Sequence, residues 1–134
     1  MNVAAFIVCL VLLEYYGMIV GVGRARGKYK INAPATVGHP IFERHFRVQQ
    51  NTMEQLIIFL PSFFIFSNYW EGALALSLIG GLFIVGRAVY WYGYVQDPKK
   101  RAAGFLMTAL AQAAVVFGGL WGAILALREV GLAG

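Results

Sequence analysis

The stretch "IFERHFRVQQNTMEQLIIFLP", residues 41–61, changes from dense polar and charged sequence to strongly apolar sequence with no turn residue between the two halves. This pattern predicts one continuous helix that starts near Ile41 or Phe42 and ends at about Ser67. Only the part after Glu54 is apolar enough for the core of a bilayer. The polar first turns must therefore face protein or water rather than lipid.

Several polar residues of this stretch share one face of the predicted helix. At 100° per residue, spacings of four, four and three place the following residues within an arc of roughly 80°: Glu43, Arg47, Asn51 and Glu54. Gln50 lies on the same side, whereas Gln49 points elsewhere. Glu43 and Arg47 could satisfy each other as an i,i+4 ion pair. Alternatively the stripe binds a ligand, since charged groups at membrane depth are costly and mark functional sites.

Composition places this helix in a membrane protein. The 134-residue chain is 60% hydrophobic and 13% charged, compared with about 25% charged residues in soluble domains. Because about 20 apolar residues cross a bilayer, the apolar runs predict four spans, approximately 3–23, 47–67, 72–94 and 102–127. We therefore expect a single domain, residues 1–134, folded as an all-α integral membrane bundle of four helices.

The net charge of +5 comes mostly from two basic segments between the spans. GRARGKYK (23–30) follows the first span and QDPKKR (96–101) follows the third, while the segment after the second span has no Lys or Arg. The positive-inside rule then places these two segments in the cytoplasm and both termini on the opposite side of the membrane. Since no soluble basic face exists to follow a phosphate backbone, we expect no nucleic-acid partner.

A second set of polar residues lies at the same end of the predicted bundle. Arg87, Tyr90 and Tyr94 fall within an arc of roughly 60°, and an interfacial aromatic belt is the alternative explanation for the tyrosines. Arg101 lies in the first turn of the fourth helix, where unpaired backbone N–H groups add positive charge. Together these residues could line one site for a ligand with carboxylates, amides and an amine. The histidines are isolated, so no metal site is expected.

Two segments resemble the MAPEG family, the membrane-associated proteins in eicosanoid and glutathione metabolism. FERHFRVQQNTMEQL resembles the family's Glu-Arg-x-x-Arg-x-x-x-Asn-x-x-Glu signature. RAVYWYGYVQDPKKR resembles its Arg-x-x-Tyr-x-x-x-Tyr segment, which is followed seven residues later by an arginine. The likeness covers essentially the whole chain. We expect a bacterial member similar to microsomal glutathione transferases, located in the inner membrane.

The resemblance implies a homotrimer of four-helix subunits that binds glutathione between neighbouring subunits. Arg101 matches the arginine that stabilises the thiolate in conjugating members, and is the expected catalytic residue. The implied glutathione-binding residues are Arg26, Arg47, Gln49, Asn51, Glu54, Arg87, Tyr90 and Tyr94, with Arg24 as the alternative to Arg26. The implied activity is that of a membrane-bound glutathione transferase or peroxidase, whose thiolate attacks a lipophilic electrophile or a lipid hydroperoxide.

The chain also departs from two specialised types of the family. Gln55 stands where leukotriene-synthase members carry tyrosine, and Thr52 stands where prostaglandin-synthase members carry aspartate, so neither specialised activity is expected. Two further functions remain open on the sequence. One is a non-enzymatic lipid-binding scaffold of the same family, and the other is a small multidrug exporter that would exchange protons through Glu14.

Overall fold

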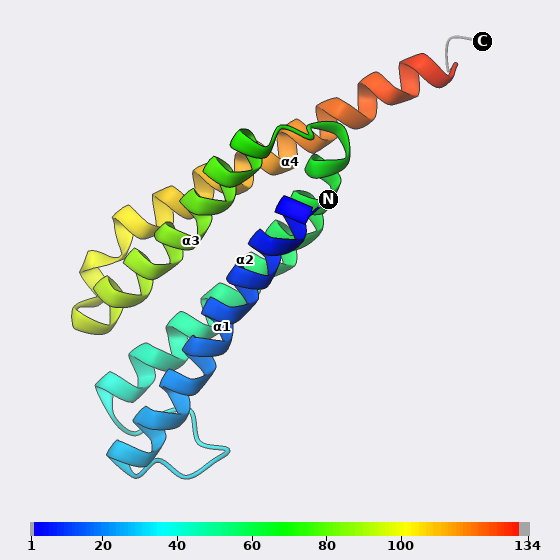
Figure 1. Cartoon of the computed structure of the whole chain (residues 1–134). Coiled ribbons are helices and arrows are strands. Elements are labelled where there is room, and N and C mark those ends of the chain that lie inside the picture. Colours follow the sequence, from blue (N-terminus) through cyan, green and yellow to red (C-terminus); the bar gives the residue numbers. More distant parts are fainter. Residues whose placement is uncertain (1, 132–134) are drawn as a thin grey trace.

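The computed structural model describes residues 2–131, which form four long helices and one 3-10 turn. In chain order they are α1 (Asn2–Tyr29), α2 (Pro40–Tyr69), α3 (Ala73–Gln96), η1 (Pro98–Arg101) and α4 (Ala102–Val130). Figure 1 shows the helices running side by side, with the α1–α2 connection and η1 at one end and the N-terminus and the α2–α3 connection at the other. The predicted four-helix bundle is confirmed, and we call the end with η1 the basic end.

The helix ends differ from the sequence prediction in two places, at the end of α1 and at the start of α4. α1 continues six residues beyond the predicted span 3–23, through the basic segment, because Arg, Ala and Lys are good helix formers and outweigh Gly23 and Gly27. The first turn of α4 is a 3-10 turn rather than α-helix. Asp97 caps this turn, since its Oδ1 accepts a hydrogen bond from the Lys99 amide at 3.0 Å.

The bundle has an apolar core toward one end and polar side chains toward the other. Phe59 of α2 stacks on Phe83 of α3 with ring centroids 3.8 Å apart, and Phe63 lies beside them. Smaller side chains of α1 and α4, including Val11 and Val115, complete this core. Toward the basic end, polar side chains replace this aromatic packing. The change from polar to apolar sequence along α2 therefore matches a change from polar to apolar side chains in the interior of the bundle.

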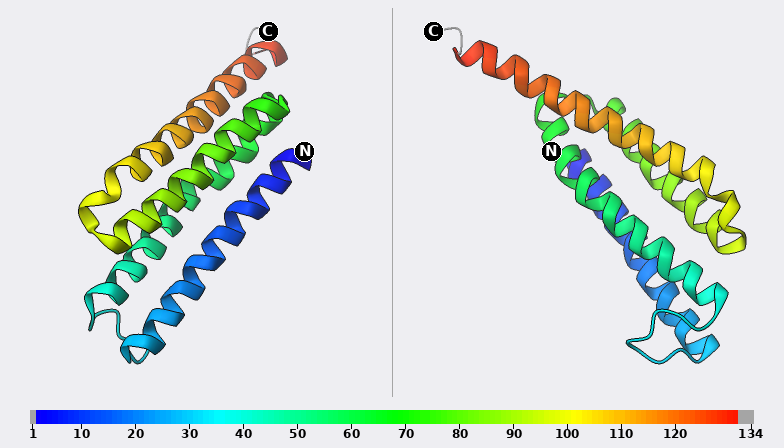
Figure 2. Two further views of the ribbon diagram at one scale, coloured as in Figure 1. Left: turned by 60° about the vertical axis from the view of Figure 1, so that its left-hand side comes forward. Right: turned by 180° about the vertical axis from the view of Figure 1, so that it is seen from behind.

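Within residues 2–131, three helical segments are long and apolar enough to cross a membrane: α1, α3 and the combined η1–α4 segment. The chain is therefore a multi-pass membrane protein. α2 is as long as the others, but Glu54, Gln55 and Asn68 interrupt its apolar half and its first turns are polar. The views in Figure 2 show α2 packed along the bundle with the other helices, and the C-terminal part of α4 extending beyond them.

Glycines allow α3 and α4 to approach closely near the basic end. A Cβ added at Gly104 would meet the backbone of Tyr90 and the carbonyl oxygen of Gly86, the latter at 2.7 Å. A Cβ at Gly93 would lie 2.8 Å from the carbonyl oxygen of Lys100. Small residues at such contacts let helix backbones pack directly in membranes. This packing fixes the start of α4, and with it Arg101, against the tyrosines of α3.

Candidate active site

A polar pocket of about 250 Å³ lies between α2, α3 and the start of α4. Every residue that lines it has a polar side chain: Arg47, Gln50, Asn51, Glu54, Tyr90, Tyr94 and Arg101. Three different helices thus direct polar groups into one space, as the helical spacings in the sequence suggested. Six of the nine residues expected to form the site lie together here.

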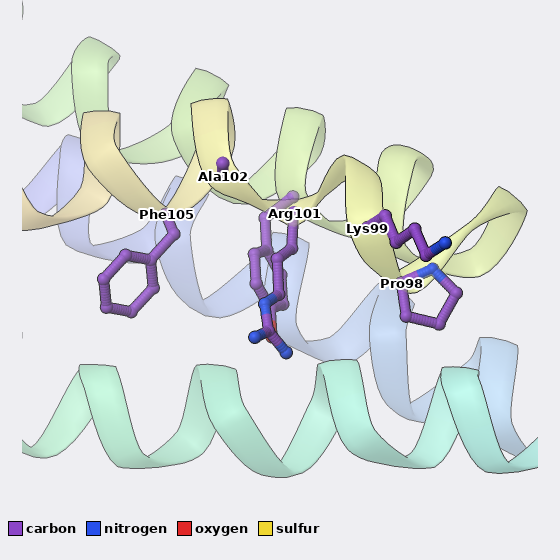
Figure 3. A pocket seen from close by; sticks show the side chains of 6 residues that line it. Pro98, Lys99, Arg101, Ala102 and Phe105 are labelled. Carbon is purple, nitrogen blue, oxygen red and sulfur yellow. The ribbon is translucent and has the colours of Figure 1, made fainter.

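A larger cavity of about 700 Å³ adjoins this polar pocket. It is lined partly by apolar groups, including Ala102 and Phe105 of α4, and it shares Tyr90 and Arg101 with the polar pocket. In Figure 3 the side chains of Arg101 and Phe105 both extend from the start of α4 toward α2. A group held between Tyr90 and Arg101 would therefore face polar walls on one side and a more apolar space on the other.

The side chain of Arg87 lies behind the pocket wall rather than in it. It is fully buried, and its Nε donates to Thr108 Oγ1 at 2.9 Å. Its Nη1 donates to Asn51 Oδ1 at 2.8 Å and to Thr52 Oγ1 at 3.2 Å, and the guanidinium lies 4.2 Å from the centroid of the Tyr90 ring. Because Arg87 occupies the carbonyl oxygen of Asn51, the Asn51 amide nitrogen remains available to the pocket.

Local contacts hold the end of α3 and the start of α4 in place around Arg101. Arg44 Nη1 donates to the carbonyl oxygens of Val95 and Gln96, at 3.1 and 3.0 Å, and so satisfies the C-terminus of α3. Asp97 then caps η1 immediately beyond it. Arg44, at the edge of the polar stripe, therefore ties α2 to α3 and is not free to bind a ligand.

The remaining expected residues lie outside the polar pocket of their own chain. Gln49 points toward α1, where its Nε2 donates to the hydroxyl of Tyr15 at 2.7 Å. Arg26 donates to the carbonyl oxygen of Ala35 at 2.7 Å and stacks over Phe42. Arg24, the alternative to Arg26, lines a different cavity on α1. The structure therefore does not bring Gln49 or either of these arginines together with the other six.

The charged groups of the polar pocket are not neutralised by one another. Among residues 2–131, the hydrogen-bonded arginines are Arg26, Arg44 and Arg87, and the guanidiniums of Arg47 and Arg101 take no part in these bonds. Glu43 accepts a hydrogen bond from the Gly38 amide at 3.4 Å instead of pairing with Arg47. Arg47 and Arg101 are both close enough to Tyr90 to interact with it electrostatically. The pocket thus offers unpaired charge to a ligand.

Sequence reasoning did not single out Phe105 on the apolar side of the site, or the partners of Arg87. Phe105 lies one helical turn after Arg101, a spacing of four that could have placed it on the same face of α4. Thr108 lies seven residues after Arg101, but its contact with Arg87 depends on the close approach of α3 and α4. Nothing in the local pattern of α4 signals that contact.

The half-buried Glu14 acts electrostatically on Arg87 across the α1–α3 contact. Arg87 Nη2 is buried and has no hydrogen-bond partner among residues 2–131. Glu14 lines neither the polar pocket nor the adjoining cavity. Glu14 thus lies near Arg87 but outside both the polar pocket and the adjoining cavity.

These features define a class: a multi-pass helical membrane protein with a polar, charged pocket at one end of its bundle. The chain belongs to the MAPEG family, whose model matches residues 3–121. It is 39% identical to an uncharacterised protein of Synechocystis sp. over 94% of this chain and 91% of that protein. The family resemblance of the sequence is thereby confirmed, and the multidrug-exporter alternative loses its basis.

Two relatives with named activities show which branches of the family this chain is similar to. Microsomal glutathione S-transferase 2 of Homo sapiens is 41% identical over 65% of this chain and 58% of its own length. Leukotriene C4 synthase of Cavia porcellus is 35% identical over 91% of this chain and 74% of its own length. The match to the first of these therefore spans less than two thirds of that protein's length.

The two positions that depart from the specialised types have structural partners in this chain. Gln55 accepts a hydrogen bond from Gln112 Nε2 at its side-chain oxygen, 2.6 Å away, which joins α2 to α4. Thr52 is buried and accepts from Arg87. Neither residue lines the polar pocket, so both act here in helix packing.

Proposed function

We propose that this protein is a membrane-bound glutathione transferase that activates the thiol of glutathione as a thiolate for attack on a lipophilic electrophile or a lipid hydroperoxide. The observation that carries the proposal is the position of Arg101 and Tyr90 at the boundary between the polar pocket and the adjoining cavity. A water-soluble thiol and an oily substrate would meet at this boundary. The family membership supports the glutathione-related chemistry.

The charges of the polar pocket suit glutathione. Arg47, Arg101 and Glu54 give the pocket two positive groups and one negative group, and glutathione carries two carboxylates and one ammonium. Charge-assisted hydrogen bonds of guanidinium to carboxylate and of carboxylate to ammonium are among the stronger polar contacts in proteins. The amides of Asn51 and Gln50 match the peptide groups of the tripeptide.

The chemistry needs a group that favours the ionised thiol. A thiol with a pKa of about 8.5 is mostly protonated at neutral pH, and a nearby guanidinium stabilises its anion. Each unit by which the thiol pKa falls corresponds to about 1.4 kcal/mol. The thiolate sulfur would then form a bond to the electrophilic carbon while the leaving group departs with its bonding electrons. With a hydroperoxide, the sulfur would attack the terminal oxygen and break the O–O bond, which releases an alcohol after proton uptake from water. A second glutathione would convert the resulting sulfenic acid to the disulfide and water. Arg101 would remain as the counter-charge throughout.

We further propose the assembly and orientation that the family resemblance and the basic segments imply. In a homotrimer, Arg26 and Gln49 could reach glutathione only from a neighbouring subunit, because in their own chain they lie off the pocket. If all four helices span the membrane, the positive-inside rule places the basic end in the cytoplasm. The bound glutathione would then enter from the cytoplasm, and the membrane would be the bacterial inner membrane.

The first test measures thiolate formation directly. Purified protein mixed with glutathione is expected to show the ultraviolet absorbance of a thiolate at neutral pH, and Arg101→Ala is expected to abolish it. Lys100→Ala is the matched control, because Lys100 carries the neighbouring positive charge but does not line the polar pocket. Absence of thiolate in the unmodified protein, despite bound glutathione, would favour the lipid-binding scaffold and refute the transferase.

A second test concerns the carboxylate of the pocket. Glu54→Gln is expected to weaken glutathione binding by about 1 to 3 kcal/mol, because it leaves the ammonium of the ligand without its counter-charge. Isothermal titration calorimetry in detergent measures the affinity. Glu43→Gln removes the same charge from the same helix outside the pocket, and is expected to leave the affinity unchanged. If both variants bound glutathione with equal affinity, the polar residues of α2 would have a structural role only.

A further inference from the structure

A separate cavity of about 360 Å³ lies at the basic end, between α1, α2 and α3. We call it the basic cavity, because Arg24 and Lys28 of α1 line it and no carboxylate does. His45 and Trp91 contribute from α2 and α3. It shares no lining residue with the polar pocket or with the cavity that adjoins it. The proposed glutathione chemistry therefore leaves this cavity without a role.

Cationic groups concentrate in the basic cavity without counter-charges. Arg24 and Lys28 are four residues apart on α1, so their side chains lie on the same face one turn from each other. Lys28 Nζ lies 5.4 Å from the centroid of the Tyr29 ring. Two like charges held side by side repel unless an anion lies between them. The cavity is complementary in charge to such an anion.

His45 adds an unsatisfied polar atom to the same space. Its Nδ1 is buried and has no hydrogen-bond partner among residues 2–131. This atom faces α1, since a Cβ at Gly21 would lie 3.5 Å from it. Buried polar atoms in folded proteins nearly always have a partner, so an unpaired one needs an explanation. A ligand oxygen or its bound water in the basic cavity would supply the missing partner.

Two glycines on α1 leave space for the basic cavity. A Cβ at Gly21 would approach Trp91 to 3.2 Å, and one at Gly17 would approach the same ring to 3.7 Å. Both glycines line the basic cavity together with Val20. The six-membered ring of the Trp91 indole therefore packs against these two glycines and forms an apolar wall of the basic cavity.

An apolar cavity of about 380 Å³ continues from this wall on the outer side of α3. It shares His45 and Trp91 with the basic cavity and is otherwise lined mainly by Ala88, Tyr92 and Val95. A cationic space and an apolar space thus meet at one histidine and one tryptophan. Aromatic residues with this placement are typical of the headgroup level of a bilayer.

We propose that the basic cavity binds the phosphate headgroup of an anionic phospholipid, with one acyl chain in the apolar cavity against Trp91. Basic pockets between membrane helices bind lipid headgroups in this way. The phosphate is held by Arg24 and Lys28, and His45 Nδ1 pairs with the headgroup or its bound water. The ligand is a structural or regulatory lipid, bound apart from the thiol chemistry.

Tryptophan fluorescence tests this site without reference to activity. Trp70 follows the last residue of α2, and Trp121 lies in the part of α4 remote from η1. Trp70→Phe/Trp121→Phe therefore leaves Trp91 as the reporter. The protein is placed in phosphatidylcholine bilayers that contain an equal minor fraction of brominated phosphatidylglycerol or brominated phosphatidylcholine. Quenching of Trp91 should show the anionic lipid to be favoured about tenfold or more. A variant that retains Trp70 alone should show no such preference.

Charge variants distinguish lipid binding in the basic cavity from a general attraction of anionic lipid to the positively charged end of the protein. Arg24→Gln/Lys28→Gln should abolish the preference, whereas Lys30→Gln/Lys100→Gln removes two charges from the same end outside the cavity and should retain it. Native mass spectrometry of the protein with all three tryptophans, comparing retained phosphatidylglycerol, repeats the comparison if the tryptophan variants do not fold. Equal loss in both charge variants would overturn the proposal.

Two further outcomes would also overturn it. If inorganic phosphate relieves the quenching of Trp91, the basic cavity is a site for a free anion and not for a lipid. If neither brominated lipid quenches Trp91, protein covers the cavity, as a second copy of the chain would. None of these readings depends on thiolate formation, so the lipid site and the transferase proposal can fail independently.

Discussion

Replacing Gly104 with alanine should destabilise the protein by about 2 kcal/mol, although alanine is the better helix former. The added Cβ would meet the amide nitrogen of Tyr90, and would lie 2.6 Å from Tyr90 Cα and 2.7 Å from the carbonyl oxygen of Gly86. All three are backbone atoms, which cannot rotate away as a side chain can. α3 and α4 must therefore separate, and Arg101 must move away from Tyr90.

Thermal unfolding in detergent, followed by circular dichroism, measures the stability change. Gly81→Ala is the matched control, because Gly81 is also helical but has no atom within 4 Å of its added Cβ. That variant should retain its stability or gain up to about 1 kcal/mol from helix propensity. The Gly104 variant should also lose thiolate formation, whereas the Gly81 variant should keep it. Equal stabilities would show that the two helices do not depend on backbone contact.

The sequence could predict that three polar residues of α2 share one face, because that grouping depends on a single helix. Arg47, Asn51 and Glu54 are separated by four and three residues, and helical geometry alone places them on one face. The same reasoning grouped Arg87 with Tyr90 and Tyr94. The helical spacing could not show that Arg87 lies behind the pocket while Tyr90 and Tyr94 line it. Spacing along one helix does not tell which neighbouring helix covers each side chain.

The features that the sequence did not predict depend mainly on contacts between helices. Arg87 is fully buried because Gly86 and Gly104 let α4 approach and bring Thr108 to its Nε. The end of α1 was predicted too early because the basic segment was taken as the end of the helix as well as the end of the apolar span. Charge marks where a helix leaves the bilayer, whereas helix propensity decides where it stops.

Arg87→Met should reduce glutathione affinity by about 1 to 3 kcal/mol, even though Arg87 does not line the polar pocket. The substitution removes the donor to Asn51 Oδ1, so the Asn51 amide is free to rotate away from the ligand. Asn51→Ala should cost a similar amount, because it removes the amide itself. Calorimetric titration of both single variants and of the double variant measures the two losses and their interaction.

The double variant distinguishes action through Asn51 from a general effect of Arg87. If Arg87 acts by orienting Asn51, removing both residues should cost little more than removing one, with an interaction energy of about 0.5 to 3 kcal/mol. Thr108→Val provides the matched control, since it removes the acceptor for Arg87 Nε but leaves the bond to Asn51 in place. It should therefore reduce stability more than affinity. Additive losses in the double variant would mean that Arg87 affects glutathione by a route that does not include Asn51.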